Sequence, residues 1–122
     1  MSRQHQALLD AIEQMEEAVE QAMAFVAGMD KHAFLADVKT QMAVSMAFII
    51  MGESVSRILA MYPHIADDHG DIPWQKIKGM RNLVAHEYFE LEFDAVWMTV
   101  HDDLPPLLSQ LRMLRQIRAQ GE

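Results

Sequence analysis

The chain has 122 residues, no cysteine and a formal net charge of −8, from 10 basic and 18 acidic residues. A chain of this length is typical of one domain and can bury a hydrophobic core unaided, so we expect residues 1–122 to form a single domain. The lack of cysteine excludes disulfides, thiolate metal sites and a cysteine nucleophile. The acidic balance argues against a general nucleic-acid binder, because phosphate contacts dominate such binding.

The N-terminal segment MSRQHQALLDAIEQMEE is charged and amphipathic, unlike a signal peptide. No stretch approaches the roughly 18 consecutive apolar residues of a membrane span. The longest apolar patch is Met46–Met51. We therefore expect a cytoplasmic protein that does not enter a membrane.

The first predicted helix runs from Gln4 to Ala27, because apolar residues recur there at spacings of three and four. Gly28 follows it and is a residue type that commonly ends helices. Four glutamates fall outside the apolar stripe, and we expect them to be solvated: Glu13, Glu16, Glu17 and Glu20. Asp30 is placed to cap a single short helical turn, and Asp37 to cap the next long helix.

The second long helix, from about Val38 to Tyr62, carries two apolar rows. One row is Val38, Met42, Met46 and Ile49, and the other is Val44, Phe48, Met51, Val55 and Ile58. Together they cover most of the circumference, so this helix is expected to be buried on several sides, as the central helix of a bundle or as a dimerisation helix. Glu53 and Arg57, spaced i, i+4, either form a surface pair or line a cleft.

The third long helix is expected to begin at Pro73 and to end near Tyr88 or Phe89. The polar segment before it, His64–Ile72, is expected to be a loop, and its histidines and aspartates match no metal-binding motif. A last helix runs from about Asp94 to Ala119, with a kink or an interruption at Pro105–Pro106 and frayed last residues. Its core-facing residues are expected to be Phe93, Val96, Trp97, Val100, Leu104, Leu107, Leu108, Leu111, Leu114 and Ile117.

No stretch shows the alternation of a β-strand. Four main helices with short connections predict an all-α protein, an antiparallel up-down bundle of four to five helices. The second long helix has more apolar surface than one bundle core can cover. We therefore expect a homodimer or a larger homo-oligomer.

The segment Pro73–Tyr88, PWQKIKGMRNLVAHEY, gathers the polar residues with chemical potential. On one helix, Asn82 and His86 share a face and Arg81 shares a neighbouring one with Tyr88. Arg81 and His86 lie about 140° apart. The arginine can bend round, the helix can unwind after Ala85, or a second copy can complete the site across a twofold axis. We favour the second copy, which also explains the apolar helix.

This set of residues suits RNA cleavage without a metal or cofactor. A histidine can take a proton from a ribose 2′-hydroxyl or give one to the leaving oxygen. Arginine can clamp the phosphate, and Asn82 can orient either group. Lys76 and Lys78 precede the motif, and Lys78 can line a basic cleft together with Glu53 and Arg57. The competing interpretation is a core histidine beside a surface salt bridge.

The order of residues in the motif, Arg81-Asn82-x-x-x-His86-x-Tyr88, resembles the R-x4-H-x-Y signature of the HEPN superfamily. It is most similar to the HepT-like toxins of HEPN/MNT toxin–antitoxin pairs. The similarity extends from about Leu8 to Leu111. It includes the segments Asp37–Gln41, Met51–Val55, Ile72–Trp74, Gly79–Asn82 and Val96–Trp97.

The resemblance implies a dimeric, metal-independent endoribonuclease toxin whose two motifs face each other across a cleft. It implies that Arg81 and His86 carry catalysis, with Asn82 supporting them. It also implies a minimal nucleotidyltransferase antitoxin as partner, which transfers AMP to Tyr88. One alternative is a non-catalytic helical module that binds a nucleotide or docks a nucleotidyltransferase. A carboxylate-bridged metal bundle is disfavoured, because the chain has no Glu-x-x-His pair.

Overall fold

Helices account for all the regular secondary structure in residues 2–121, the part of the chain that the computed structural model describes. The all-α prediction is therefore confirmed. In chain order the elements are α1 (Arg3–Phe25), α2 (Lys31–Leu35), α3 (Val38–Met61), α4 (Ile65–Asp68), α5 (Trp74–His86), the 3₁₀ turn η1 (Tyr88–Glu90), α6 (Phe93–Met98), the π-helical turn η2 (Thr99–Asp103) and α7 (Leu104–Gln120). Within His64–Ile72, the helical turn α4 corrects the prediction of a loop.

The helix ends follow the capping residues that the sequence indicates. Gly28 adopts a φ of +80° three residues after α1, in the left-handed region that glycine tolerates. The carboxylate of Asp30 accepts a hydrogen bond from Ala33 N at 2.7 Å, and that of Asp37 accepts one from Thr40 N at 3.1 Å. Both are N-caps, as predicted. These caps fix where α3 starts and therefore its register against α1.

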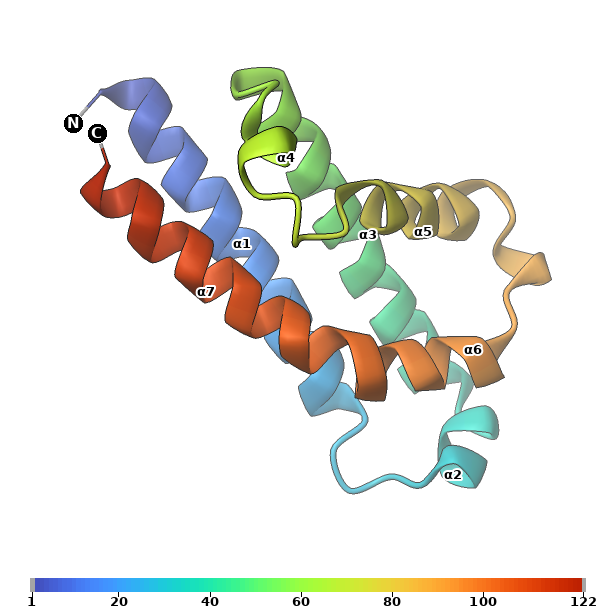
Figure 1. Cartoon of the computed structure of the whole chain (residues 1–122). Coiled ribbons are helices and arrows are strands. Elements are labelled where there is room, and N and C mark those ends of the chain that lie inside the picture. The colour runs from blue at the N-terminus through green and yellow to red at the C-terminus, as the bar shows by residue number, and fades with distance from the viewer. Residues whose placement is uncertain (1, 122) are drawn as a thin grey trace.

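Two long helices, α1 and α7, lie side by side, and α3 packs against α1 behind them (Figure 1). α5 leaves this group and crosses α3, and its last turn points away from the two chain ends. The core lies between α1, α3 and α7 and contains the apolar stripe of α1, one row of α3 and most of the α7 set. Its most buried large side chains include Leu8, Ile12, Met15, Val44, Met51, Val55, Ile58, Leu111 and Leu114.

Only one of the two apolar rows of α3 is buried in the single chain. Val44 and its row face the core, whereas Val38, Met42 and Met46 are 64%, 57% and 56% exposed. The expectation that α3 is buried on several sides is wrong for one chain. By length and composition α3 could cross a membrane, but half of its apolar window is buried inside the protein. α3 packs against both α1 and α5, as a core helix of a bundle does.

The interruption expected in the last helix occurs just before the two prolines. Pro105 and Pro106 occupy the first turn of α7, where their missing N–H groups cost little. The preceding residues, Thr99–Asp103, form a wider π-helical turn, an irregularity that interrupts the α-helical hydrogen bonding just before the prolines. α7 then continues to Gln120, and Glu122 lies outside the described residues. Ile117 is 47% exposed, so its predicted core position is wrong.

Ion pairs attach α7 to its neighbours. Arg115 donates through Nε and Nη2 to the carboxylate of Glu16, at 2.5 and 3.1 Å. Glu16 is buried, which corrects its predicted solvation: at that position α7 covers α1. The hydrogen bond and charge of Glu16 raise the pKa of Arg115. Arg112 and Arg118 pair with Glu20 and Asp68, at 3.8 and 3.5 Å.

Candidate functional site

The motif helix α5 begins at Trp74, directly after Pro73. The Trp74 indole donates to the carbonyl of His69 at 3.0 Å, which ties the start of α5 to the preceding segment. The helix ends at His86, because Glu87 has non-helical backbone angles, φ −137° and ψ 42°. The expected end near Tyr88 or Phe89 is therefore wrong. Tyr88 does not continue α5, so its helical spacing from Arg81 does not apply.

Gly52 of α3 allows the backbone of the motif helix to approach closely. A Cβ atom at this glycine would lie 2.1 Å from Arg81 Cβ and 2.6 Å from Arg81 Cγ. Such distances are far below the roughly 3.5–4.0 Å of a normal carbon contact. No side chain larger than hydrogen fits there unless α5 shifts. Gly52 thus sets the height of Arg81 above α3.

The guanidinium of Arg81 is held by two polar side chains. Its Nη2 lies 2.9 Å from Glu53 Oε1, and its Nη1 donates to Asn82 Oδ1 at 3.3 Å. Its side chain is partly exposed, so solvent and a ligand can reach it. The contact with Glu53 rules out the surface pair between Glu53 and Arg57, which was one of the two expected alternatives. Arg57 instead donates to Gln14 of α1 at 2.7 Å, so it helps to join α3 to α1.

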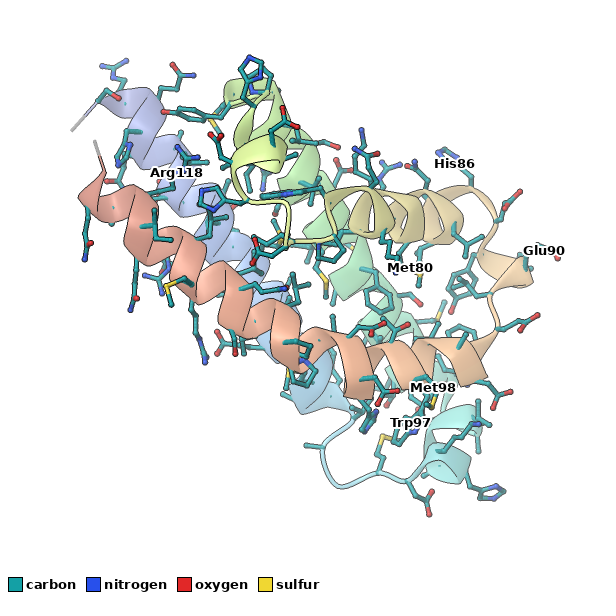
Figure 2. The ribbon with its side chains drawn as sticks, viewed as in Figure 1. Met80, His86, Glu90, Trp97, Met98 and Arg118 are labelled. Carbon is teal, nitrogen blue, oxygen red and sulfur yellow. The ribbon has the colours of Figure 1, made fainter. Side chains whose placement is uncertain are left out.

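His86 occupies the last position of α5 and is exposed, as is Asn82 one turn earlier. Figure 2 shows His86 at the outer edge of α5, directed away from the rest of the bundle. The helix does not unwind after Ala85, and the side chain of Arg81 does not bend toward His86, because it contacts Glu53 and Asn82 instead. His86 lies five positions after Arg81 on the helix, which corresponds to a rise of about 7.5 Å and a rotation of about 140°. Within one chain, the two side chains leave α5 in different directions.

Tyr88 lies just beyond α5, in the turn η1. Its ring makes edge contacts with Phe89 and Phe93, with centroids 5.9 and 6.0 Å away. The side chain is half-buried, and its hydroxyl forms no hydrogen bond within residues 2–121. Because Tyr88 is only half-buried, its hydroxyl is not among the buried polar atoms that need a partner inside the protein. The oxygen is therefore available to an external group.

The sequence model of the family "Ribonuclease HepT-like" matches residues 15–114. The chain belongs to the HepT-like ribonuclease family. It is 34% identical to a Thermococcus cleftensis protein named "Probable ribonuclease HepT", over 95% of this chain and 100% of the relative. It is 29% identical to a "Putative RNase" of Caldanaerobacter subterraneus, over 75% of this chain and 79% of the relative. No solved structure matches it.

Membership in this family confirms the predicted resemblance and the prediction of an RNA-cleaving enzyme. The roles of Arg81, Asn82, His86 and Tyr88 stay predictions. Lys78, the remaining candidate for the cleft, is half-buried on α5. In the described part of the HepT-like chain, no three histidine or acidic side chains gather closely enough to hold a metal ion.

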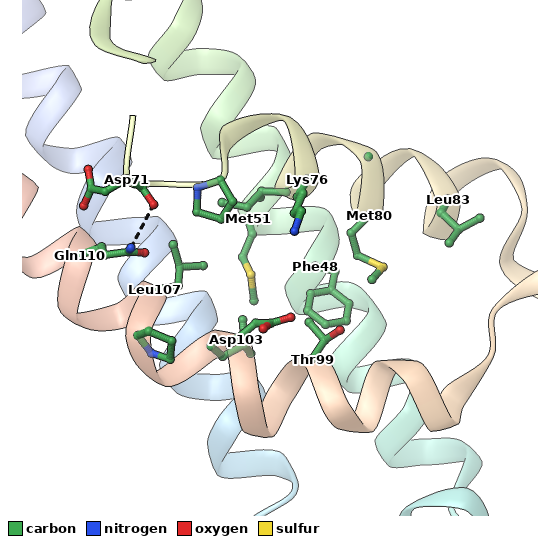
Figure 3. A pocket seen from close by; sticks show the side chains of 15 residues that line it. Phe48, Met51, Asp71, Lys76, Met80, Leu83, Thr99, Asp103, Leu107 and Gln110 are labelled. Atoms are coloured by element: carbon green, nitrogen blue, oxygen red, sulfur yellow. Dashed lines mark hydrogen bonds between the residues drawn. The ribbon is translucent and has the colours of Figure 1, made fainter. Parts of the chain in front are cut away.

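A groove of about 490 Å³ lies on another side of the motif helix (Figure 3). It separates α5 from η2 and the start of α7. Phe48, Met51 and Met80 form part of its apolar lining, while Lys76 and Asp103 contribute charge. Arg81, Asn82 and His86 are not part of it. No sequence pattern indicates this groove, because its walls come from three separate segments of the chain.

Gly52 is the site residue whose role sequence reasoning missed. A glycine inside an otherwise apolar helix indicates a close backbone approach, and this signal was present. What the sequence could not supply is the partner in that approach. Arg81 lies 29 positions later and is brought there by the crossing of α5 over α3.

Proposed function

We propose that this HepT-like ribonuclease is the cytoplasmic toxin of a toxin–antitoxin pair. It cleaves RNA without a metal ion, at a cleft between two copies of the chain. Arg81 and His86 are its catalytic residues, and Asn82 orients them. The observation that carries the proposal is the arrangement of α5: Arg81 is fixed by Gly52 and Glu53, while His86 is exposed on a different side.

In this reaction, His86 accepts the proton of the ribose 2′-hydroxyl, whose oxygen attacks the adjacent phosphorus. The bond to the 5′-oxygen breaks, and that oxygen takes up a proton from solvent as it leaves, while His86 returns its own proton to solvent. The products are a 2′,3′-cyclic phosphate and a 5′-hydroxyl, so no water is consumed. Arg81 stabilises the charge that grows on the phosphate oxygens. The exposed pair with Glu53 is weak enough for a phosphate to replace the carboxylate.

The proposed dimer places the exposed row of α3 between the two copies. At 100° per residue, Val38, Met42, Met46 and Glu53 fall on one stripe of the helix. Three of these are exposed apolar side chains, and the fourth is the partner of Arg81. A second copy that covered the stripe would end beside the motif. It could then bring its own His86 toward Arg81, which one chain does not do.

A mixing experiment tests the composite site. Arg81→Ala and His86→Ala are each expected to lose at least about 100-fold in kcat/KM, in line with the loss of a charge-stabilising or proton-transferring group. If each site takes Arg81 from one chain and His86 from the other, a mixed dimer of the two variants contains one intact site. Mixing after mild unfolding and refolding should therefore restore cleavage. If both residues act within one chain, the mixture stays inactive.

The same cleavage assay also tests whether the reaction requires a metal ion, independently of which chain supplies Arg81 and His86. Cleavage in EDTA, with a cyclic phosphate at the new 3′ end, is the expected result. Cleavage that stops in EDTA and returns with magnesium would refute the metal-free mechanism. No cleavage by the wild-type protein, with normal binding to a nucleotidyltransferase, would favour the non-catalytic alternative.

The proposed regulation is AMP transfer to Tyr88 by a minimal nucleotidyltransferase antitoxin. Its support is the half-buried phenol, whose hydroxyl has no hydrogen-bond partner among the described residues. Tyr88 lies two positions after His86, so a nucleotide attached there adds bulk and a negative charge near the proposed base. Both effects oppose the binding of RNA.

A further inference from the structure

Phe89 is the most exposed large apolar side chain in the described part of the protein, at 97%. It lies in η1, three residues after His86, at the turn between α5 and α6. Figure 2 labels Glu90 in the same turn, at the outer tip of the molecule. Single exposed apolar residues are common. An aromatic ring that is almost fully exposed beside a proposed catalytic histidine is not explained by packing.

The ring is nevertheless held in place. Phe34 is fully buried and contacts Phe93 at 6.1 Å, Phe93 contacts Tyr88 at 6.0 Å, and Tyr88 contacts Phe89 at 5.9 Å. The last contact is edge-on, with the two rings inclined at 76°. Such a contact positions Phe89 without covering it. A rigid aromatic side chain loses little conformational entropy when it binds a ligand.

We propose that Phe89 is a stacking platform for a nucleobase of the RNA substrate, next to the phosphate that is cut. The inference rests on the proposed role of His86 and adds a residue that determines substrate preference. Bases of single-stranded RNA stack on exposed aromatic rings whatever their sequence. Loss of one such contact typically weakens binding by about 5- to 150-fold.

The charges around Phe89 indicate which part of the RNA can reach it. Three exposed glutamates flank Phe89 in the sequence: Glu87, Glu90 and Glu92. Their negative charges repel phosphates. The RNA backbone is therefore expected to run past Arg81 of the other copy, which the proposed dimer brings toward His86, with a base extended toward Phe89. A carboxylate can accept a hydrogen bond from the exocyclic amino group of cytosine. Uracil has no such group, so the platform should prefer cytosine to uracil.

The test measures the binding of fluorescent 2′-O-methyl RNA, whose blocked 2′-oxygen prevents cleavage. Oligocytidylate and oligouridylate are compared at one fixed salt concentration, because affinity for RNA depends strongly on salt. We expect Phe89→Ala to weaken oligocytidylate binding by about 5- to 150-fold. Phe89→Trp should preserve it. Met113→Ala, which removes another exposed apolar side chain on α7, should bind like the wild type.

Each outcome has a distinct meaning. Wild-type binding to RNA that is unchanged in Phe89→Ala refutes the platform and leaves the proposed function standing. A Phe89→Ala protein that loses its dimer, as measured by sedimentation, refutes the platform in favour of a protein contact. A wild-type protein that binds neither RNA refutes the proposed function together with the inference. If the carboxylate of Glu90 accepts the hydrogen bond from the amino group of cytosine, the ratio of oligocytidylate affinity to oligouridylate affinity should fall in Glu90→Gln.

Discussion

Replacing Gly52 with alanine tests the contact that positions Arg81. The added methyl group would lie 2.1 Å from Arg81 Cβ, so α3 and α5 must separate by about 1.5 Å at that point to reach a normal contact. Overpacking of this kind costs about 1–3 kcal/mol. Replacing glycine with alanine inside a helix recovers about 1 kcal/mol. The net expectation is a loss of up to about 2 kcal/mol in the free energy of unfolding.

Gly79 supplies a matched control on the other side of the same crossing. It lies inside α5, and a Cβ atom there would meet nothing within 4 Å. Gly79→Ala should therefore gain the helix propensity without the clash, about 1 kcal/mol of stability. Urea unfolding followed by circular dichroism measures both variants. The two substitutions are chemically identical, so opposite signs would isolate the effect of the contact.

The activity of Gly52→Ala should fall further than its stability. A displacement of about 1 Å in a positioning group can lower the rate by about 100-fold. We therefore expect most of the protein to be folded at 25 °C, with RNA cleavage reduced by one to two orders of magnitude, on the order of the loss from that displacement. If Gly52→Ala is as stable as Gly79→Ala and cleaves RNA like the wild type, α5 does not cross α3 at this point and the account of Arg81 is wrong.

Three further predictions concern other parts of the chain. Arg115→Ala should lose about 1–3 kcal/mol of stability, because it leaves the buried carboxylate of Glu16 without its hydrogen-bond donors. Arg112→Ala removes only the exposed pair with Glu20 and should change the free energy of urea unfolding by less than about 0.5 kcal/mol. Hydrogen bonds from Thr40 lower the pKa of Asp37 in the folded protein. The stability that the ionised carboxylate contributes is therefore fully present above the pKa of the unfolded state, and it is lost as the pH falls through the pKa of the folded state. The Tm difference between the wild type and Asp37→Asn should shrink below about pH 4. Tyr88→Phe should still cleave RNA in the presence of an AMP-transferring partner that inhibits the wild type. If the partner inhibits this variant as well, and mass spectrometry shows full modification at another residue, the proposed regulation through Tyr88 is wrong.

The fold could be predicted from sequence because local signals agree with one another. The apolar spacing in α1, the caps at Asp30 and Asp37, and the prolines at the start of α7 each indicate the structure that forms. The errors arise where a long-range contact decides the outcome. Glu16 resembles its solvated neighbours in the sequence and is buried only because α7 covers it.

The candidate site shows the same division. The spacing of Arg81, Asn82 and His86 identified the motif, but a helical projection extended α5 two residues too far and placed Tyr88 on it. The helix ends where Glu87 adopts non-helical backbone angles, and no proline or glycine in the sequence indicates an end at this position. Likewise, the i, i+4 spacing of Glu53 and Arg57 indicated a surface pair as one of two alternatives, and that pair does not form. Glu53 instead pairs with Arg81 of α5, and Arg57 forms a hydrogen bond with Gln14 of α1.

The distribution of charge reconciles an acidic protein with an RNA substrate. The three arginines of α7 pair with Glu20, Glu16 and Asp68 and therefore serve the packing of the bundle. The cations left near the motif lie on α5, and the best placed of them, Arg81, is already paired with Glu53. In the proposed site, a phosphate has to compete with that carboxylate for Arg81, which disfavours loose binding to arbitrary polyanions. RNA is then expected to bind where a phosphate replaces Glu53 while another part of the nucleotide contributes affinity that does not depend on charge. An exposed ring next to the site, Phe89, can provide that contribution.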